Sequence, residues 1–346
     1  MPGEQTRTEI YQQPETWRDT VDRVAAWPHD LDASAVITGA GTSCYAALAV
    51  EAARPGTRAV ASTDLFLDFS RYLRQDSMLL SLARSGDSPE STAVVEKIGR
   101  AIPGVRQLAI TCNAGGRLAR AGNVEALLLD PRTNDRSLVM TSSFSNLTLA
   151  GILIGRAAEW RTHVLKAADL TAARLSALDE KAAEAARRSV GRIAFLASPG
   201  MLAAAREAAL KVLEMTAGRV VTLAETFLGL RHGPMSFVEP DTAVIGFVSS
   251  DPGVRRYELD LLRELRGKRR GWIVGIGAGE GDRFIFEEVI ETTAIGSPDW
   301  LRIPFDIVFA QLLGYHLSLG LGLDPDSPSP DGVITRVVQG VRIYES

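Results

Sequence analysis

The chain has few of the residues that mark metal sites and disulfide frameworks, and it has no long apolar run. Among 346 residues there are two cysteines and four histidines. Cys44 and Cys112 stand in unrelated contexts without C-x-x-C spacing, so neither a disulfide framework nor a zinc site is expected. No stretch approaches the roughly 18 apolar residues of a membrane span, and the polar N-terminus carries no apolar signal core. These absences predict a cytoplasmic protein that does not enter a membrane and holds no metal.

Basic charge is not in excess either. The 38 Lys and Arg residues stand against 42 Asp and Glu, which gives a net charge of -4 and argues against a nucleic-acid partner. The hydrophobic content of 46% and charged content of 23% are ordinary for a globular protein. The length suffices for two domains of about 150 residues each. A small-molecule ligand is therefore expected.

Two common phosphate motifs are absent. There is no G-K-[ST], which excludes a P-loop, and the turn Gly39-Ala40-Gly41 has Cys44 where a dinucleotide fingerprint has its third glycine. No nucleotide or redox cofactor is expected.

The sequence does contain a strand-turn-helix pattern that occurs in two successive series. Apolar runs predict strands at 35–38, 58–62, 78–82, 107–111 and 125–129, then at 192–197, 220–223, 243–248 and 272–276. Helices intervene, including a long apolar one over about 144–166. We expect an N-terminal helical arm (1–30), a first α/β domain (31–168), a helical connector (169–190), a second α/β domain (191–325) and a tail (326–346). In parallel sheets of this kind, ligands bind at the carboxyl ends of the strands.

Three hydroxyl-rich turns lie at such strand ends in the first domain: Gly41-Thr42-Ser43, Ser85-Gly86-Asp87-Ser88 and Thr141-Ser142-Ser143. Each could be an ordinary helix cap. Together they place neutral donors and helix N-termini where a small anion is favoured. This combination is typical of a site for the phosphate of a sugar phosphate.

A charged stripe marks the second domain. Glu207, Lys211 and Glu214 share one face of a helix that is otherwise mostly apolar. Such a pattern can be a solvated face worth a few tenths of a kcal/mol. On a helix apolar on nearly every side, however, the charges would be buried against one another, where pKa values move and acid-base chemistry becomes possible. His232, in the turn Gly229 to Pro234, is a second candidate, although a lone histidine is often structural.

The segments ITGAGTS, ARSGDSPES, MTSSFSN, REAALKVLEMTAG and LGLRHGP together resemble the sugar isomerase (SIS) domain proteins. The resemblance covers nearly the whole chain and implies two tandem flavodoxin-like domains, each a three-layer α/β/α sandwich with a parallel sheet. NDRSLVMTSSFSN and FVSSDPGVRRYELDLLREL are most similar to the tagatose-6-phosphate ketose/aldose isomerase group, whose members are reported as galactosamine-6-phosphate deaminase/isomerases. The isomerase half of glutamine:fructose-6-phosphate amidotransferase is a more distant relative.

The resemblance implies roles for the residues found above. Glu214 matches the base that moves a proton between C1 and C2, and Lys211 and Glu207 match supporting positions. His232 matches a ring-opening residue lent by the neighbouring subunit, which implies a homodimer or higher oligomer. The turn residues implied to hold the sugar phosphate are Ser43, Ser85, Ser88 and Thr141 to Ser143. No metal or cofactor is required.

Some features depart from the family pattern. Ala83 replaces a serine of the amidotransferase phosphate loop, with Arg84 beside it, and Arg336 is a candidate for closing the site. No glutaminase domain precedes the pair, so the deaminating direction is expected: galactosamine 6-phosphate to tagatose 6-phosphate and ammonia. A deglycase acting on a phosphorylated fructosamine and a non-catalytic sugar-phosphate sensor are the alternatives, and no motif fixes the sugar epimer.

Overall fold

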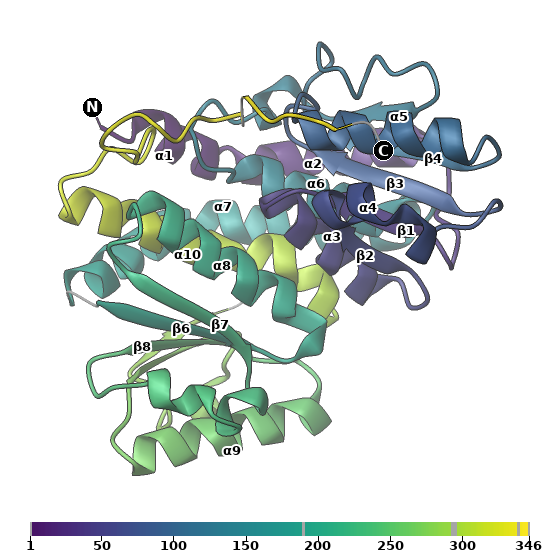
Figure 1. Cartoon of the computed structure of the whole chain (residues 1–346). Coiled ribbons are helices and arrows are strands. Elements are labelled where there is room, and N and C mark those ends of the chain that lie inside the picture. The colour runs from purple at the N-terminus through teal and green to yellow at the C-terminus, as the bar shows by residue number, and fades with distance from the viewer. Residues whose placement is uncertain (1, 189–190, 292–295, 338–339, 345–346) are drawn as a thin grey trace.

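Two parallel five-stranded sheets face each other across a common layer of helices (Figure 1). The computed structural model describes residues 2–188, 191–291, 296–337 and 340–344. The first sheet has the order β2-β1-β3-β4-β5 and the second β10-β9-β8-β6-β7, and neighbouring strands in both sheets run parallel. The strands are β1 (Val36–Gly39), β2 (Arg58–Ala61), β3 (Met78–Ala83), β4 (Arg106–Thr111), β5 (Glu125–Leu128), β6 (Arg192–Ala197), β7 (Val221–Thr226), β8 (Ala243–Phe247), β9 (Trp272–Ile276) and β10 (Glu288–Ile290).

The α-helices are α1 (Glu4–Tyr11), α2 (Gln13–Ala26), α3 (Thr42–Ala53), α4 (Ser62–Leu67), α5 (Pro89–Ala101), α6 (Ser142–Leu153), α7 (Ala157–Arg187), α8 (Leu202–Met215), α9 (Pro252–Gly267) and α10 (Asp299–Gly320). Short 3-10 turns occupy Phe69–Arg71, Pro131–Thr133, Pro199–Met201, Gly229–Arg231, Pro234–Phe237 and Glu280–Asp282. No helix in the described part of the chain is long and apolar enough to cross a membrane.

The central strands read as continuous apolar runs because both of their faces are covered. In β6, Ile193 and Phe195 face the common helical layer, whereas Ala194 and Leu196 pack with α9 on the outer face. The first sheet behaves in the same way, with α4 and α5 on its outer face. The predicted class, two tandem flavodoxin-like α/β domains with parallel sheets, is confirmed.

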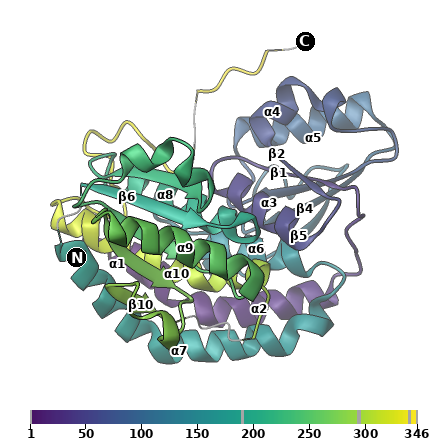
Figure 2. The same cartoon turned by 90° about the horizontal axis from the view of Figure 1, so that it is seen from below.

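The common layer contains α2, α3, α6, α7, α8 and α10. In the view from below, α2 and α7 run side by side along the lower edge of the picture (Figure 2). Gly314 lets α10 come close to α8, since a Cβ there would lie 2.9 Å from the sulfur of Met215 and 3.5 Å from the carbonyl oxygen of Lys211. The position of α8 is thus fixed by helices that belong to both halves of the chain.

The long apolar helix predicted over about 144–166 is interrupted, and that prediction was wrong. The chain turns at Gly155, which has φ +72°, where a Cβ would lie 2.1 Å from a carboxyl oxygen of Asp30. A new helix, α7, then runs through the boundary expected at 168/169. The domain limits remain a prediction, and residues 189–190 and 345–346, at the ends of the expected connector and tail, lie outside the described residues.

The tail crosses from the end of α10 to the first sheet (Figure 1, yellow). It is fastened on the way by Asp326, whose carbonyl accepts from Leu138 N at 2.9 Å and whose carboxylate accepts from Thr6 N at 2.6 Å. Further along, Ile343 and Tyr344 lie over α4 and α5. The tail therefore passes directly over the strand ends where a site was expected.

Candidate active site

The charged stripe on α8 is buried rather than solvated. The side chains of Glu207 and Lys211 are fully buried, and that of Glu214 is 31% exposed. Lys211 Nζ lies 2.6 Å from Glu214 Oε2 and 3.4 Å from Glu207 Oε1, and it donates to Thr42 Oγ1 at 3.0 Å. Thr42 belongs to α3, so the stripe of the second half binds to the first half. Their spacing along α8 places the three charged groups on one face of the helix. The packing of α3 and α10 against α8 excludes water from Glu207 and Lys211.

Burial changes the electrostatics of this stripe. It raises the pKa of Glu207 to about 8, against the ordinary 4.5, and the ammonium of Lys211 only partly offsets the effect. For Lys211, burial acts to lower the pKa, but the carboxylates of Glu207 and Glu214 outweigh it and the pKa is raised. At neutral pH the stripe therefore contains a charged Lys211 paired with Glu214 and a mostly neutral Glu207 behind them.

Glu214 opens onto a cavity of about 260 Å³ at the carboxyl ends of β1 and β3. Its other lining residues come from four places: the turn before α3, the β3–α5 loop, the segment before α6 and the tail. They are Ala40, Gly41, Thr42, Ser43, Leu82, Ala83, Arg84, Ser85, Ser88, Ser91, Leu138, Met140, Ile334, Thr335, Arg336 and Val337. Among the described residues that line it, the carboxylate of Glu214 thus shares this space with hydroxyl groups, two arginines and apolar side chains.

Two of the three predicted hydroxyl turns meet at this cavity. Gly41, at φ +54°, caps α3, and Thr42 and Ser43 form the first turn of that helix. Ser85 and Ser88 precede α5, which Pro89 begins. First-turn amides of a helix have no internal partners and favour an anion. Gly86, at φ +66°, shapes the loop without lining the cavity.

The third turn does not line the cavity, in contrast to its predicted role. Thr141 N, Ser143 N and both serine hydroxyls donate to the buried carboxylate of Asp135, at 2.5 to 2.8 Å. Asp135 is 1% exposed. The N-terminus of α6 thus donates to a carboxylate that the chain itself supplies, rather than to an open space for a ligand. Four donors of Thr141, Ser142 and Ser143 are therefore used within the chain, and none of these three residues lines the cavity.

His232 also lies away from this cavity. It follows the 3-10 turn Gly229–Arg231, is exposed, and is not among the residues lining the cavity of its own chain. The neighbouring Arg231 is fixed on α9 through Glu264 at 2.8 Å and Asp260 at 3.1 Å. The turn is therefore anchored while the imidazole points to the surface.

Sequence reasoning missed part of the cavity wall. Ser91 lies one turn after Ser88 on α5, a spacing that could have indicated it. No sequence pattern marks Leu138 and Met140 as part of the cavity wall, because only the tertiary fold brings them next to β3. The tail segment 334–337 likewise reaches the cavity through tertiary packing.

The equivalent loop of the second sheet is closed by the chain itself. Ser249 and Ser250 follow β8 as Ser85 follows β3, but Asp299 accepts from Ser250 N at 2.7 Å and from Ser250 Oγ at 2.6 Å, as well as from Ser249 Oγ. Glu258 accepts from Ser249 N at 2.7 Å. Internal carboxylates thus occupy the position where an anion would bind.

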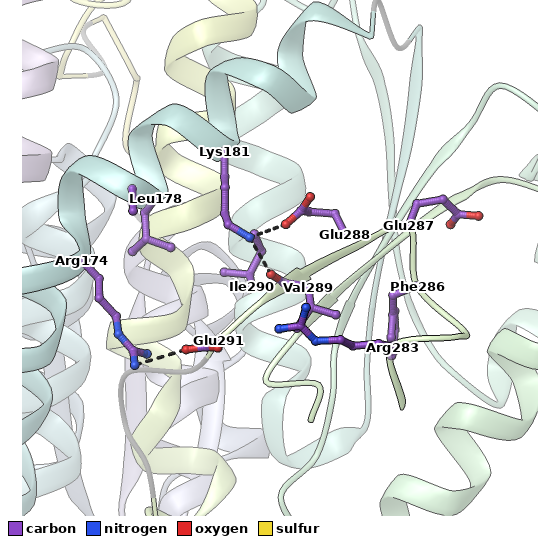
Figure 3. A pocket seen from close by; sticks show the side chains of 11 residues that line it. Arg174, Leu178, Lys181, Arg283, Phe286, Glu287, Glu288, Val289, Ile290 and Glu291 are labelled. Carbon is purple, nitrogen blue, oxygen red and sulfur yellow. Dashed lines mark hydrogen bonds and ion pairs between the residues drawn. The ribbon is translucent and has the colours of Figure 1, made fainter. Parts of the chain in front are cut away.

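A larger hollow of about 510 Å³ lies between α7 and β10, and its charges are paired (Figure 3). Lys181 binds Glu288 and the carbonyl of Val289, and Arg174 lies 3.2 Å from Glu291. It brings together neither a carboxylate-lysine stripe nor hydroxyl loops. The smaller cavity, bordered by Glu214, is the candidate active site.

The parallel sheets, the hydroxyl loops and the buried Glu-Lys-Glu stripe define a tandem SIS-domain protein. No family model matches the chain. D-galactosamine-6-phosphate deaminase AgaS of Shewanella sp. (strain ANA-3) is 35% identical over 98% of this chain and 91% of that protein. A solved structure from Clostridium novyi NT covers 100% of this chain and 96% of its own, at 30% identity and a TM-score of 0.91.

A second solved structure, tagatose-6-phosphate ketose/aldose isomerase from Escherichia coli, is 31% identical with a TM-score of 0.82, and the match covers 94% of this chain and 97% of that one. Since these similarities extend over nearly the full length of both partners, the chain belongs to the family of the D-galactosamine-6-phosphate deaminases AgaS.

Proposed function

We propose that the chain is an aldose-ketose isomerase and deaminase that converts D-galactosamine 6-phosphate and water to D-tagatose 6-phosphate and ammonia. Membership of the AgaS family supports the substrate. The observation that carries the chemistry is the position of Glu214, a partly exposed carboxylate on the cavity, held by the buried Lys211. Such a base suits proton transfer next to a carbonyl.

The proposed reaction begins with the open-chain aldehyde. Glu214 removes the proton from C2 while the C1 oxygen takes up a proton from water, which gives an enol across C1 and C2. Glu214 then returns its proton to C1 as the C2 amine loses one proton to water. The C2 amine is then an imine, which water hydrolyses to a ketone and ammonia. Glu214 is regenerated as a carboxylate, so the proposed reaction needs no cofactor. Lys211 keeps the carboxylate oriented between the two carbons, and Glu207 and Thr42 position Lys211.

The hydroxyls of Ser43, Ser85 and Ser88 are the proposed donors to the 6-phosphate, with the N-termini of α3 and α5 behind them. A phosphate held by these donors would occupy the same cavity that Glu214 borders. A substrate anchored at C6 would therefore present C1 and C2 to the base, which is how remote binding energy contributes to catalysis.

His232 is the proposed ring-opening group, supplied to the cavity by a second subunit of a homodimer or larger oligomer. Its exposure on an anchored turn is compatible with insertion into a neighbour. We also propose that the enzyme works in the cytoplasm, where sugar phosphates are found.

Ammonia release is the direct test. Wild type and Glu214→Gln are assayed with galactosamine 6-phosphate, glucosamine 6-phosphate and a phosphorylated fructosamine. Ammonia from the galacto substrate, lost in the variant while sugar-phosphate binding persists, supports the proposal. Turnover of the fructosamine instead identifies a deglycase. If none of the substrates reacts and sugar phosphates still raise the melting temperature, the protein is a sensor and the catalytic proposal fails.

A further inference from the structure

Arg84 is a buried cation beside the phosphate loop. It follows β3, is 7% exposed and lines the cavity directly before Ser85. No carboxylate forms an ion pair with it within the described ranges. Burial lowers the pKa of its guanidinium, and repulsion from Arg336 lowers it further. The carboxylates of Asp135 and Glu214 attract this guanidinium without forming an ion pair with it. A buried cation that lacks an ion-paired partner is costly, so an anion that enters the cavity would stabilise Arg84.

The same guanidinium holds two walls of the cavity by their backbone. Arg84 Nη1 donates to the carbonyls of Ser137 and Leu138, both at 3.1 Å, and Nη2 donates to the carbonyl of Arg336 at 2.7 Å. These three bonds use three of the five N–H donors of an arginine. The donors that remain, on Nε and Nη2, have no acceptor among the residues that the structure describes. Arg84 thus has capacity for a ligand after fixing the walls.

The tail brings a second cation to the same place. Arg336 donates from Nε to the carbonyl of Asp135 at 2.6 Å and from Nη2 to Asn134 Oδ1 at 2.5 Å. Its partners, like those of Arg84, are neutral oxygens. Two guanidinium groups therefore border one small cavity together with the carboxylate of Glu214, and their mutual repulsion opposes the closed tail until a further anion offsets it.

We propose that Arg84 binds the phosphate of the sugar and at the same time holds tail residues 334–337 as a cavity wall, so that phosphate binding and tail closure are coupled. This inference rests on the sugar-phosphate function proposed above. The coupling makes the phosphate a requirement for the closed site: an unphosphorylated amino sugar could reach Glu214 but would bring no anion to the two cations, which Asp135 and Glu214 attract without an ion pair to Arg84. Planar guanidinium suits both tasks, because it can bind phosphate and carbonyl oxygens together.

The first test uses inorganic phosphate alone and hydrogen exchange of the amides at 334–337. The proteins are wild type, Arg84→Gln, Arg84→Lys and the control Arg161→Gln, which removes an exposed arginine of α7 paired with Asp22. Phosphate is expected to slow tail exchange in wild type and control. In Arg84→Gln the phosphate affinity falls at least tenfold and the tail no longer responds.

Arg84→Lys separates charge from geometry. An ammonium keeps the charge but cannot reach three carbonyls, so phosphate affinity stays within a few-fold of wild type while tail protection is lost. If Arg84→Gln does not fold, as judged by its thermal transition, the Arg84→Lys variant alone decides whether the proposal holds. Wild-type affinity together with wild-type tail protection, in either variant that folds, overturns the proposal.

Kinetics distinguish failure of the inference from failure of the function. With galactosamine 6-phosphate, Arg84→Gln is expected to raise KM at least tenfold and to change kcat less. If wild type releases ammonia and the variant has an unchanged KM, the function stands and the inference is wrong. If no amino-sugar phosphate reacts, yet phosphate binding and tail protection depend on Arg84, the inference stands and the function fails.

Discussion

Replacing Glu207 by glutamine removes a carboxyl group whose pKa the fold raises from 4.5 to about 8. Glutamine has nearly the same shape and can keep the contacts to Thr42 and Lys211. The two proteins therefore differ mainly in titration. A group with a raised pKa in the folded state contributes stability that is full below its unfolded pKa and is lost as the pH rises through its folded pKa.

The magnitude follows from the two pKa values. Between about pH 5 and about pH 8 the unfolded chain is ionised at Glu207 while the folded chain holds the proton. The free energy of unfolding of wild type should then fall by roughly 3 kcal/mol relative to Glu207→Gln over this range. Glu9, whose pKa burial raises to about 7, titrates in both proteins, and its effect cancels in the difference.

Urea unfolding at half-unit pH steps measures this difference. Glu184→Gln, an exposed change on α7, is the matched control and should follow wild type at every pH. The expected result is that the free energy of unfolding of Glu207→Gln, relative to that of wild type, rises steadily towards pH 8. A constant difference across the range would mean that Glu207 is already ionised in the folded protein, and the description of a mostly neutral carboxyl behind Lys211 would be refuted.

Three further changes test the site and its support. Glu214→Gln should lower kcat by about 10² to 10⁴ with KM within a few-fold of wild type, as measured by ammonia release, because it removes the base and leaves the phosphate loops intact; a loss below tenfold would exclude it as the base. Mixing Glu214→Gln subunits with His232→Ala subunits should restore about a quarter of the wild-type activity if each site takes its histidine from a partner, and no recovery on refolded mixtures would contradict a shared site. Asp135→Ala should lower the free energy of unfolding by about 3 kcal/mol or more, since four donors at the start of α6 lose a buried charged acceptor; a thermal shift within one degree of wild type would show that Asp135 is dispensable.

Local pattern sufficed for the sheets and for the stripe. Strands covered on both faces appear as unbroken apolar runs, so nine of the ten strands found in the described residues could be predicted. β10 was missed because its three residues include Glu288 and form no such run. Glu207, Lys211 and Glu214 were found by helical spacing, which fixes their common face whatever packs against it.

Other features depend on contacts that no local pattern records. Asp135 and Thr141 are six residues apart, yet nothing in their spacing tells whether the donors of the turn meet an internal carboxylate or a ligand. Gly155 occurs inside an apolar stretch, and only the approach of Asp30 shows why the helix must break there. Arg336 is brought to the cavity from the far end of the chain.

The stripe and the two hydroxyl loops proposed to bind phosphate belong to different halves of the chain, and this division has a mechanical consequence. The distance from Glu214 to these loops depends on how the helices between the two sheets pack. The close contact at Gly314, where α10 lies against the turn of α8 that carries Lys211, is one such point. Any substitution that widens the contact between α8 and α10 would therefore shift Glu214 relative to the two loops. A displacement of a catalytic group by about 1 Å can cost a hundredfold in rate. Residues that do not contact the substrate, such as Gly314, are therefore expected to control the alignment of Glu214.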